Sequence, residues 1–148
     1  MDNLKLIARI AGQRIALPAS AVESVVEVDA ITPVPLAAPH IAGLAALRSR
    51  VLTVIDSYAA LELGFAPRVG LLQAVVVTTD NHLYGLLVDE VEDVAAIAGE
   101  PMPLPAGLGR GWSRMAIGLV EHEGHAILLL DPARLVVGPT SPVNLVAV

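Results

Sequence analysis

The stretch QAVVVTTDNHLYGLLVDEVEDV, residues 73–94, decides the fold of this chain. Residues 73–79 are rich in β-branched side chains, which pack well on a pleated surface. Asp80-Asn81-His82 is typical of a tight turn, and residues 83–88 return as an apolar run. Val91 and Val94 continue the apolar pattern beyond it. The stretch therefore predicts an antiparallel β-hairpin followed by a further strand or a bend.

The same alternation of short apolar runs and turn residues extends in both directions from this hairpin. Asp131 followed by Pro132 is typical of a helix start, with Asp131 as N-cap. Prolines exclude regular strand pairing in residues 30–40, and the Gly- and Pro-rich residues 98–113 predict a long loop. Further strands are predicted at 4–11, 15–17, 22–28, 41–47, 51–55, 114–120 and 126–130, with helical turns at 18–20 and 58–63.

This pattern of about ten short strands predicts an all-β fold, since the chain has no room for the crossover helices of a parallel sheet. Residues 64–70, which include Pro67, are expected to connect two halves of similar size. Paired small barrels with short helical turns fit this organisation better than an α/β fold.

Composition narrows the classes of partner and of chemistry. The chain has 148 residues, is 55% hydrophobic and carries a formal net charge of -6, which disfavours nucleic acid and anionic lipid as partners. The absence of cysteine excludes disulfides, Cys-ligated zinc and thiol catalysis. No signal-peptide pattern and no apolar run of about 18 residues occurs, so we expect a cytoplasmic chain without direct membrane insertion. The high apolar fraction leaves self-association open.

Two segments resemble the signatures of CheW-like domains. The first, IAGLAALRSRVLTVID at 41–56, keeps the Leu-Arg core of the family's Asn-Leu-Arg-Gly motif, while Ala46 and Ser49 replace its Asn and Gly. The second, YGLLVDEVEDV at 84–94, matches the family pattern Gly-x-x-Val-Asp-x-Val-x-x-Val closely. The resemblance covers nearly all of residues 4–137.

The resemblance implies one CheW-like domain over residues 1–148, made of two five-stranded, SH3-like barrels with an apolar groove between them. We place the first barrel at about 12–63, the second at about 71–137 and a tail at 138–148, and leave open whether the N-terminal strand is shared. The implied function is a non-enzymatic adaptor that couples the cytoplasmic tips of methyl-accepting chemoreceptors to the regulatory domain of a CheA-type histidine kinase. By the same resemblance, the partner-binding residues are Glu27, Gly43, Arg48, Val88 and Val91.

Arg48 lies in an otherwise apolar segment, so its guanidinium must reach solvent or be paired, and we expect a pair with Glu27. That pair either orients the groove wall or only pins the first barrel. Ser49 is expected to be strained if the turn needs the positive φ of the family's Gly. The acidic residues of 89–93 alternate between strand faces, so we expect a solvated acidic edge rather than a metal site.

No sequence pattern points to catalysis or to a cofactor. No Gly-x-Ser-x-Gly occurs, and residues 107–111 lack the Gly-Lys-Ser/Thr ending of a phosphate loop. His122 and His125 flank a predicted hairpin tip without a third ligand in view, so no metal is expected. Trp112 either anchors the long loop on a barrel or belongs to an interface. The alternative to the chemotaxis adaptor is a regulatory module of another pathway, controlling a response regulator or a cyclase.

Overall fold

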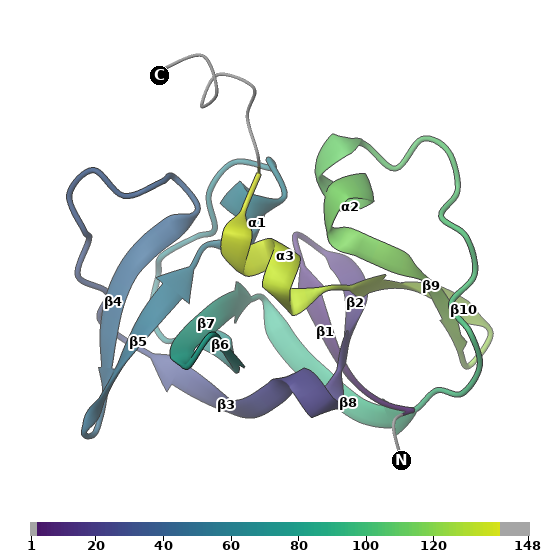
Figure 1. Cartoon of the computed structure of the whole chain (residues 1–148), viewed down its shortest axis with the longest axis horizontal. Helices are drawn as coiled ribbons and strands as arrows, with labels where there is room; N and C mark the ends of the chain where they lie inside the picture. Colours follow the sequence, from purple (N-terminus) through teal and green to yellow (C-terminus); the bar gives the residue numbers. More distant parts are fainter. Residues whose placement is uncertain (1–2, 140–148) are drawn as a thin grey trace.

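The computed structural model describes residues 3–139, which form two five-stranded sheets (Figure 1). The predicted all-β fold with two five-stranded units is confirmed. Sheet A has the order β8 (Glu90–Ala96), β1 (Leu4–Ile10), β2 (Gln13–Pro18), β10 (His125–Leu130), β9 (Ala116–His122). Sheet B has the order β3 (Val22–Val28), β6 (Leu72–Thr79), β7 (His82–Val88), β5 (Arg50–Ile55), β4 (Ile41–Leu47).

The two halves of the chain exchange hairpins between the sheets. The β1–β2 hairpin lies in sheet A, but β3, β4 and β5 of the same half lie in sheet B, where the β6–β7 hairpin completes them. In return, β8, β9 and β10 cross back to sheet A (Figure 1). Strand pairing therefore differs from the expected barrels at 12–63 and 71–137. The reason is that β3 and β8 each leave the hairpin that precedes them and pair with the other half.

Three of the hairpins close through two-residue turns in which both residues have positive φ. The predicted turn at Asp80 and Asn81 has φ of 50° and 65°. Glu123 and Gly124 make the equivalent turn in the last hairpin. Such turns match the right-handed twist of the flanking strands, which explains why local sequence located these hairpins correctly.

Four short helices follow or interrupt the strands. Asp131 caps α3 (Pro132–Val137) by accepting from the Ala133 N–H at 3.0 Å, as predicted. The expected helix at 58–63 is α1 (Ser57–Ala60), which begins one residue earlier, and η1 (Ala19–Ala21) follows β2. The helix α2 (Arg110–Met115) was missed, because the sequence around it predicts a loop.

The α2 helix folds against the end of α1 at a glycine. A Cβ on Gly111 would lie 1.7 Å from the Leu61 carbonyl oxygen, so only glycine permits this approach. Glu62 then accepts from Arg110 at 3.4 Å and from Arg114 at 3.1 Å. Trp112 packs against the main core, which supports its anchoring interpretation.

The main hydrophobic core fills the seam between the sheets and joins them into one unit. It contains buried side chains from sheet A, from sheet B and from all three α-helices, among them Ile15, Leu86, Leu61, Met115 and Leu135. A smaller cluster lies within each sheet. Within residues 3–139, no helix is long and apolar enough to cross a membrane.

Candidate functional site

Three of the five predicted partner-binding residues meet around Gln73, the second residue of β6. Glu27 on β3 and Val88 on β7 are its register partners on either side. The Val91 backbone N–H, in β8, donates to Gln73 Oε1 at 2.7 Å. Sequence reasoning missed Gln73, although a polar residue at the head of an apolar strand is a signal that could have drawn attention to it. We call Glu27, Gln73, Val88 and Val91 the Gln73 cluster.

The Gln73 cluster combines apolar and polar surface. Val88 is only 7% exposed and Val91 packs against the main core, whereas Glu27 is exposed. Because a backbone N–H can only donate, the hydrogen bond from Val91 fixes the oxygen of the Gln73 amide toward β8. The amide nitrogen then remains a donor, and no described residue accepts from it.

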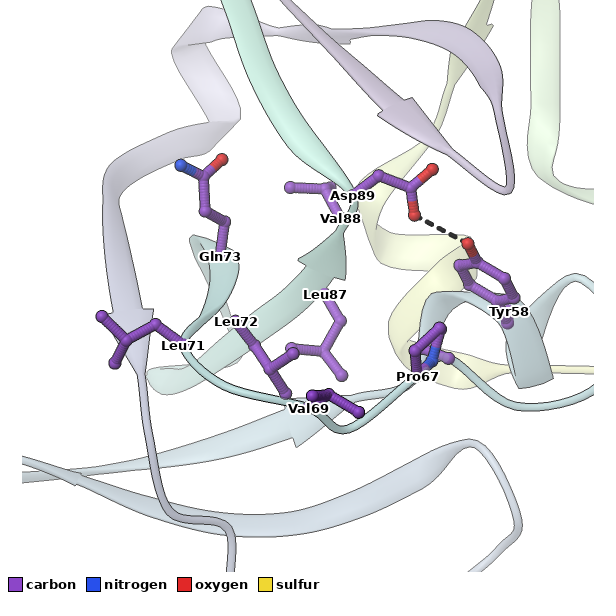
Figure 2. A pocket seen from close by; sticks show the side chains of 10 residues that line it. Tyr58, Pro67, Val69, Leu71, Leu72, Gln73, Leu87, Val88 and Asp89 are labelled. Carbon is purple, nitrogen blue, oxygen red and sulfur yellow. Dashed lines mark hydrogen bonds between the residues drawn. The ribbon is translucent and has the colours of Figure 1, made fainter.

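A pocket of about 390 Å³ adjoins this cluster, and Figure 2 shows its side chains. Gln73, Val88, Tyr58 and Asp89 supply one part of its lining. The remainder is apolar and comes from the chain connecting α1 to β6, from the start of β6 and from β7: Ala66, Pro67, Val69, Leu71, Leu72 and Leu87. Val69 and Leu71 are 83% and 62% exposed. A pocket of this size, lined mostly by apolar side chains with Tyr58, Gln73 and Asp89 as its polar ones, suits an apolar side chain of a partner.

Asp56, which is fully buried, holds the segment between α1 and β6 that lines one side of the pocket. Its carboxylate caps α1 through the Ala59 N–H at 3.2 Å. It also accepts from the Ala66 N–H at 3.1 Å and pairs with Arg68 at 2.7 Å. The connecting segment is therefore held in place beside the pocket, because a buried carboxylate needs these partners.

The remaining predicted residues, Gly43 and Arg48, lie on β4 and in the turn that follows it. In the strand order of sheet B, β4 is at the opposite end from β3. Gly43 has a φ of 147°, and a Cβ there would lie 2.2 Å from the Thr32 carbonyl oxygen. Gly43 thus lets the loop before β4 approach closely, through the two hydrogen bonds of 2.8 Å between Thr32 and Leu44.

The expected ion pair between Arg48 and Glu27 does not form. Both side chains are exposed, and neither has an ion pair among residues 3–139. The apolar segment around Arg48 is two strands joined by a turn, so the guanidinium reaches solvent there. The positive φ of this turn, 50°, falls on Arg48 and not on Ser49, so the loss of the family Gly does not strain Ser49.

A different pair forms on the same sheet, between Arg50 and Glu23 at 3.0 Å. Glu23 also accepts from the Thr78 hydroxyl at 2.7 Å. These contacts lower the pKa of Glu23, with the hydrogen bond from Thr78 as the larger cause and Arg50 second.

The acidic residues of 89–93 were expected to form a solvated edge, but two of them make specific contacts. Glu92 accepts from Arg9 at 2.6 Å and from Arg14 at 2.8 Å. These bonds, the one from Arg9 first, lower the pKa of Glu92. Asp89 accepts from the Tyr58 hydroxyl at 2.7 Å, the dashed line in Figure 2. Burial, and secondarily this bond, raises the pKa of Tyr58.

The histidines do not gather into a binding site in the part of the chain described. Within residues 3–139, no group of three or more His, Cys, Asp or Glu side chains could hold a metal ion. His122 Nε2 lies 3.8 Å from Glu123 at the last hairpin tip. His40, for which the sequence indicated no partner, is buried, with Nε2 2.9 Å from the Val136 carbonyl oxygen.

A family model, a curated relative and a solved structure all relate this chain to CheW proteins. The CheW-like domain matches residues 5–138. The chain is 27% identical over 124 residues to the chemotaxis protein CheW of Thermotoga maritima, which covers 84% of this chain and 81% of that protein. The crystal structure of the scaffolding protein TtCheW from Thermoanaerobacter tengcongensis has a similar fold, with a TM-score of 0.75 at 22% identity, over 88% of this chain and 89% of that one. Because the family match spans nearly the whole described structure, this chain belongs to the CheW-like domain family.

Proposed function

We propose that this chain is a non-enzymatic signalling adaptor, which couples chemoreceptor tips to the regulatory domain of a CheA-type histidine kinase in the cytoplasm. Membership in the CheW-like domain family supports an adaptor role. The observation that carries the proposal is the convergence of Glu27, Val88 and Val91 on Gln73, beside an apolar pocket.

The proposed mechanism is complementarity between surfaces. An apolar side chain at the receptor tip enters the pocket, and Glu27 with the free amide nitrogen of Gln73 fixes its orientation through polar contacts. Gly43 and Arg48, on β4 and in the turn that follows it, are further contacts of the partner in this proposal.

Calorimetry with the cytoplasmic hairpin of a chemoreceptor from the same organism tests this proposal. Leu71→Asp puts a charge at the pocket, and we expect it to weaken binding at least about tenfold, since desolvating an unpaired charge is costly. Val51→Asp is the matched control, because Val51 is 63% exposed on β5 and does not line the pocket. Equal loss in both variants would contradict the location of the site, and absence of binding by the unmodified protein would contradict the partner.

A second function is favoured by two observations, the departure from the family motif at Ala46 and Ser49 and the absence of an ion pair between Arg48 and Glu27. On that alternative, the chain regulates a response regulator or a cyclase through the same surface. Affinity capture from native cells separates the two functions. Recovery of receptors and kinase supports the adaptor, whereas recovery of another regulator without them supports the alternative.

A further inference from the structure

Asp89 occupies the point where the chain leaves sheet B and enters sheet A, between β7 and β8. Its Oδ1 accepts from the Tyr58 hydroxyl at 2.7 Å, and its Oδ2 accepts from the Gly12 backbone N–H at 2.9 Å. Its own N–H donates to the Arg9 carbonyl oxygen at 2.7 Å. One residue thus joins α1, the β1–β2 hairpin and the crossover strand, three segments that are distant in the sequence.

The other crossover, from β2 to β3, has no such connection. It passes through η1, whose N-terminal Pro18 makes no side-chain cap. No side-chain hydrogen bond holds residues 19–21 in the part of the chain that the structure describes. Both crossovers connect one sheet to the other, but only the second one has such contacts. A crossover therefore does not need them, which indicates that the contacts of Asp89 have a further role.

Asp89 also borders the pocket. Tyr58, Val88 and Asp89 all belong to its lining, so the bond between Tyr58 and Asp89 closes one wall (Figure 2). Both carboxylate oxygens are used as acceptors, one from a hydroxyl and one from an amide. An asparagine at this position offers a single acceptor oxygen, and its NH₂ group would face a donor. The arrangement therefore requires a carboxylate and not only a polar side chain of the same shape.

We propose that Asp89 is a positioning residue: by holding Tyr58 and Gly12, its carboxylate fixes the crossover between the sheets and keeps the pocket beside Val88 in its binding-competent shape. The consequence for partners rests on the proposed adaptor function. The connection itself is a property of the free protein and is testable without any partner.

The free protein is tested first, in a Tyr84→Phe background that leaves Tyr58 as the single tyrosine, since the sequence contains two. Absorbance titration should show that Asp89→Asn lowers the pKa of Tyr58 toward its ordinary value. The reason is that the negative carboxylate, which accepts a hydrogen bond from the Tyr58 hydroxyl, is replaced by a neutral amide. Glu90→Gln, which removes a neighbouring carboxylate without a hydrogen bond to Tyr58, is the matched control. An unchanged titration of Asp89→Asn would overturn the proposal.

A distance measurement then reports on the crossover. The chain contains no cysteine, so spin labels at Val51→Cys on sheet B and Val94→Cys on sheet A are specific. Double electron–electron resonance measures the distance between the two labels. The distribution of this distance should be broader or shifted in Asp89→Asn, compared with the unmodified chain and with Glu90→Gln. If Asp89→Asn does not fold, Tyr58→Phe removes one of the two side-chain contacts and should broaden the distribution less. An unchanged distribution in every folded variant would contradict a role in fixing the sheets.

Binding completes the test. With the receptor hairpin, Asp89→Asn should raise Kd about tenfold, while Glu90→Gln should leave it unchanged. The effects of Asp89→Asn and Tyr58→Phe should not add fully, since both weaken the contact between residues 58 and 89. If Asp89→Asn has a broader distance distribution but binds the hairpin with unchanged Kd, the positioning role is overturned and the adaptor function is unaffected. No binding by the unmodified protein would instead refute the adaptor function and any role of Asp89 in it, while the titration still decides whether the connection exists.

Discussion

Sheets A and B have equivalent strand orders, but sheet B is held by more specific contacts. In each sheet a loop pairs through a single bridge with the edge strand, Thr32 with Leu44 of β4 in sheet B and Met102 with Leu119 of β9 in sheet A. In each, a glycine lies beneath that bridge, and an aspartate follows the inner strand. Only in sheet B is the aspartate fully buried and the glycine left-handed. The contacts of Asp56 hold the segment that lines the pocket beside the Gln73 cluster.

The largest difference between the sheets should appear at the two aspartates. Asp56→Ala removes the acceptor of the Ala59 N–H, the Ala66 N–H and the half-exposed Arg68, so we expect a loss of about 4 kcal/mol in the free energy of unfolding. Asp131→Ala removes a partly exposed cap of α3 and should cost about 1 kcal/mol. Urea unfolding of both variants measures the difference. Equal losses would show that the buried contacts of Asp56 do not distinguish the sheets.

The two glycines should give the next largest difference. Gly43→Ala combines a left-handed backbone with a Cβ 2.2 Å from the Thr32 carbonyl oxygen, so we expect about 3 kcal/mol of destabilisation. Gly118 is not left-handed, and its Cβ would lie 2.7 Å from the Met102 carbonyl oxygen, a less severe approach than at Gly43. Gly118→Ala should therefore cost about 1 kcal/mol. Thermal unfolding of the pair checks this order, and a larger loss at Gly118 would reverse the comparison.

Acid should weaken both sheets through one glutamate each. Glu92 in sheet A and Glu23 in sheet B have pKa values below the ordinary 4.5, so each contributes stability above pH 4.5 that is lost as the pH falls through its lowered value. We expect Glu92→Gln and Glu23→Gln each to be less stable than the unmodified chain at neutral pH and to lose less on acidification. Urea midpoints above and below pH 4.5 measure these effects, which are small because both glutamates are at the surface.

Most of the individual elements could be predicted because their signals are local. The turn at Asp80-Asn81 and the cap formed by Asp131 with Pro132 each depend on residues next to one another in the sequence. The α2 helix could not be predicted in the same way. Its glycines indicate a loop, and the contact of Gly111 with Leu61 that favours the helix comes from a distant segment.

The exchange of hairpins and the centre of the site were also beyond local reasoning. The pairing of β1 with β8, for example Leu4 opposite Ala96, has no marker in either strand. Gln73 became visible only when strand register placed it between Glu27 and Val88. The absent pair of Arg48 with Glu27 is a different case, because the predicted strands at 41–47 and 51–55 already place Arg48 in a turn, where its guanidinium reaches solvent without a partner.

The exchange of hairpins has a consequence for the order in which the protein folds during synthesis. All five strands of sheet B come from one continuous stretch, 22–88, so they are complete before β8 is translated. The β1–β2 hairpin emerges first, yet its partners β8 and β10 emerge last. The apolar face of that hairpin includes Leu6, Ile10 and Ile15, and it lacks its strand partners until the end of the chain has been synthesised. During that time, sheet B is the folded part of the main core against which this face can be buried.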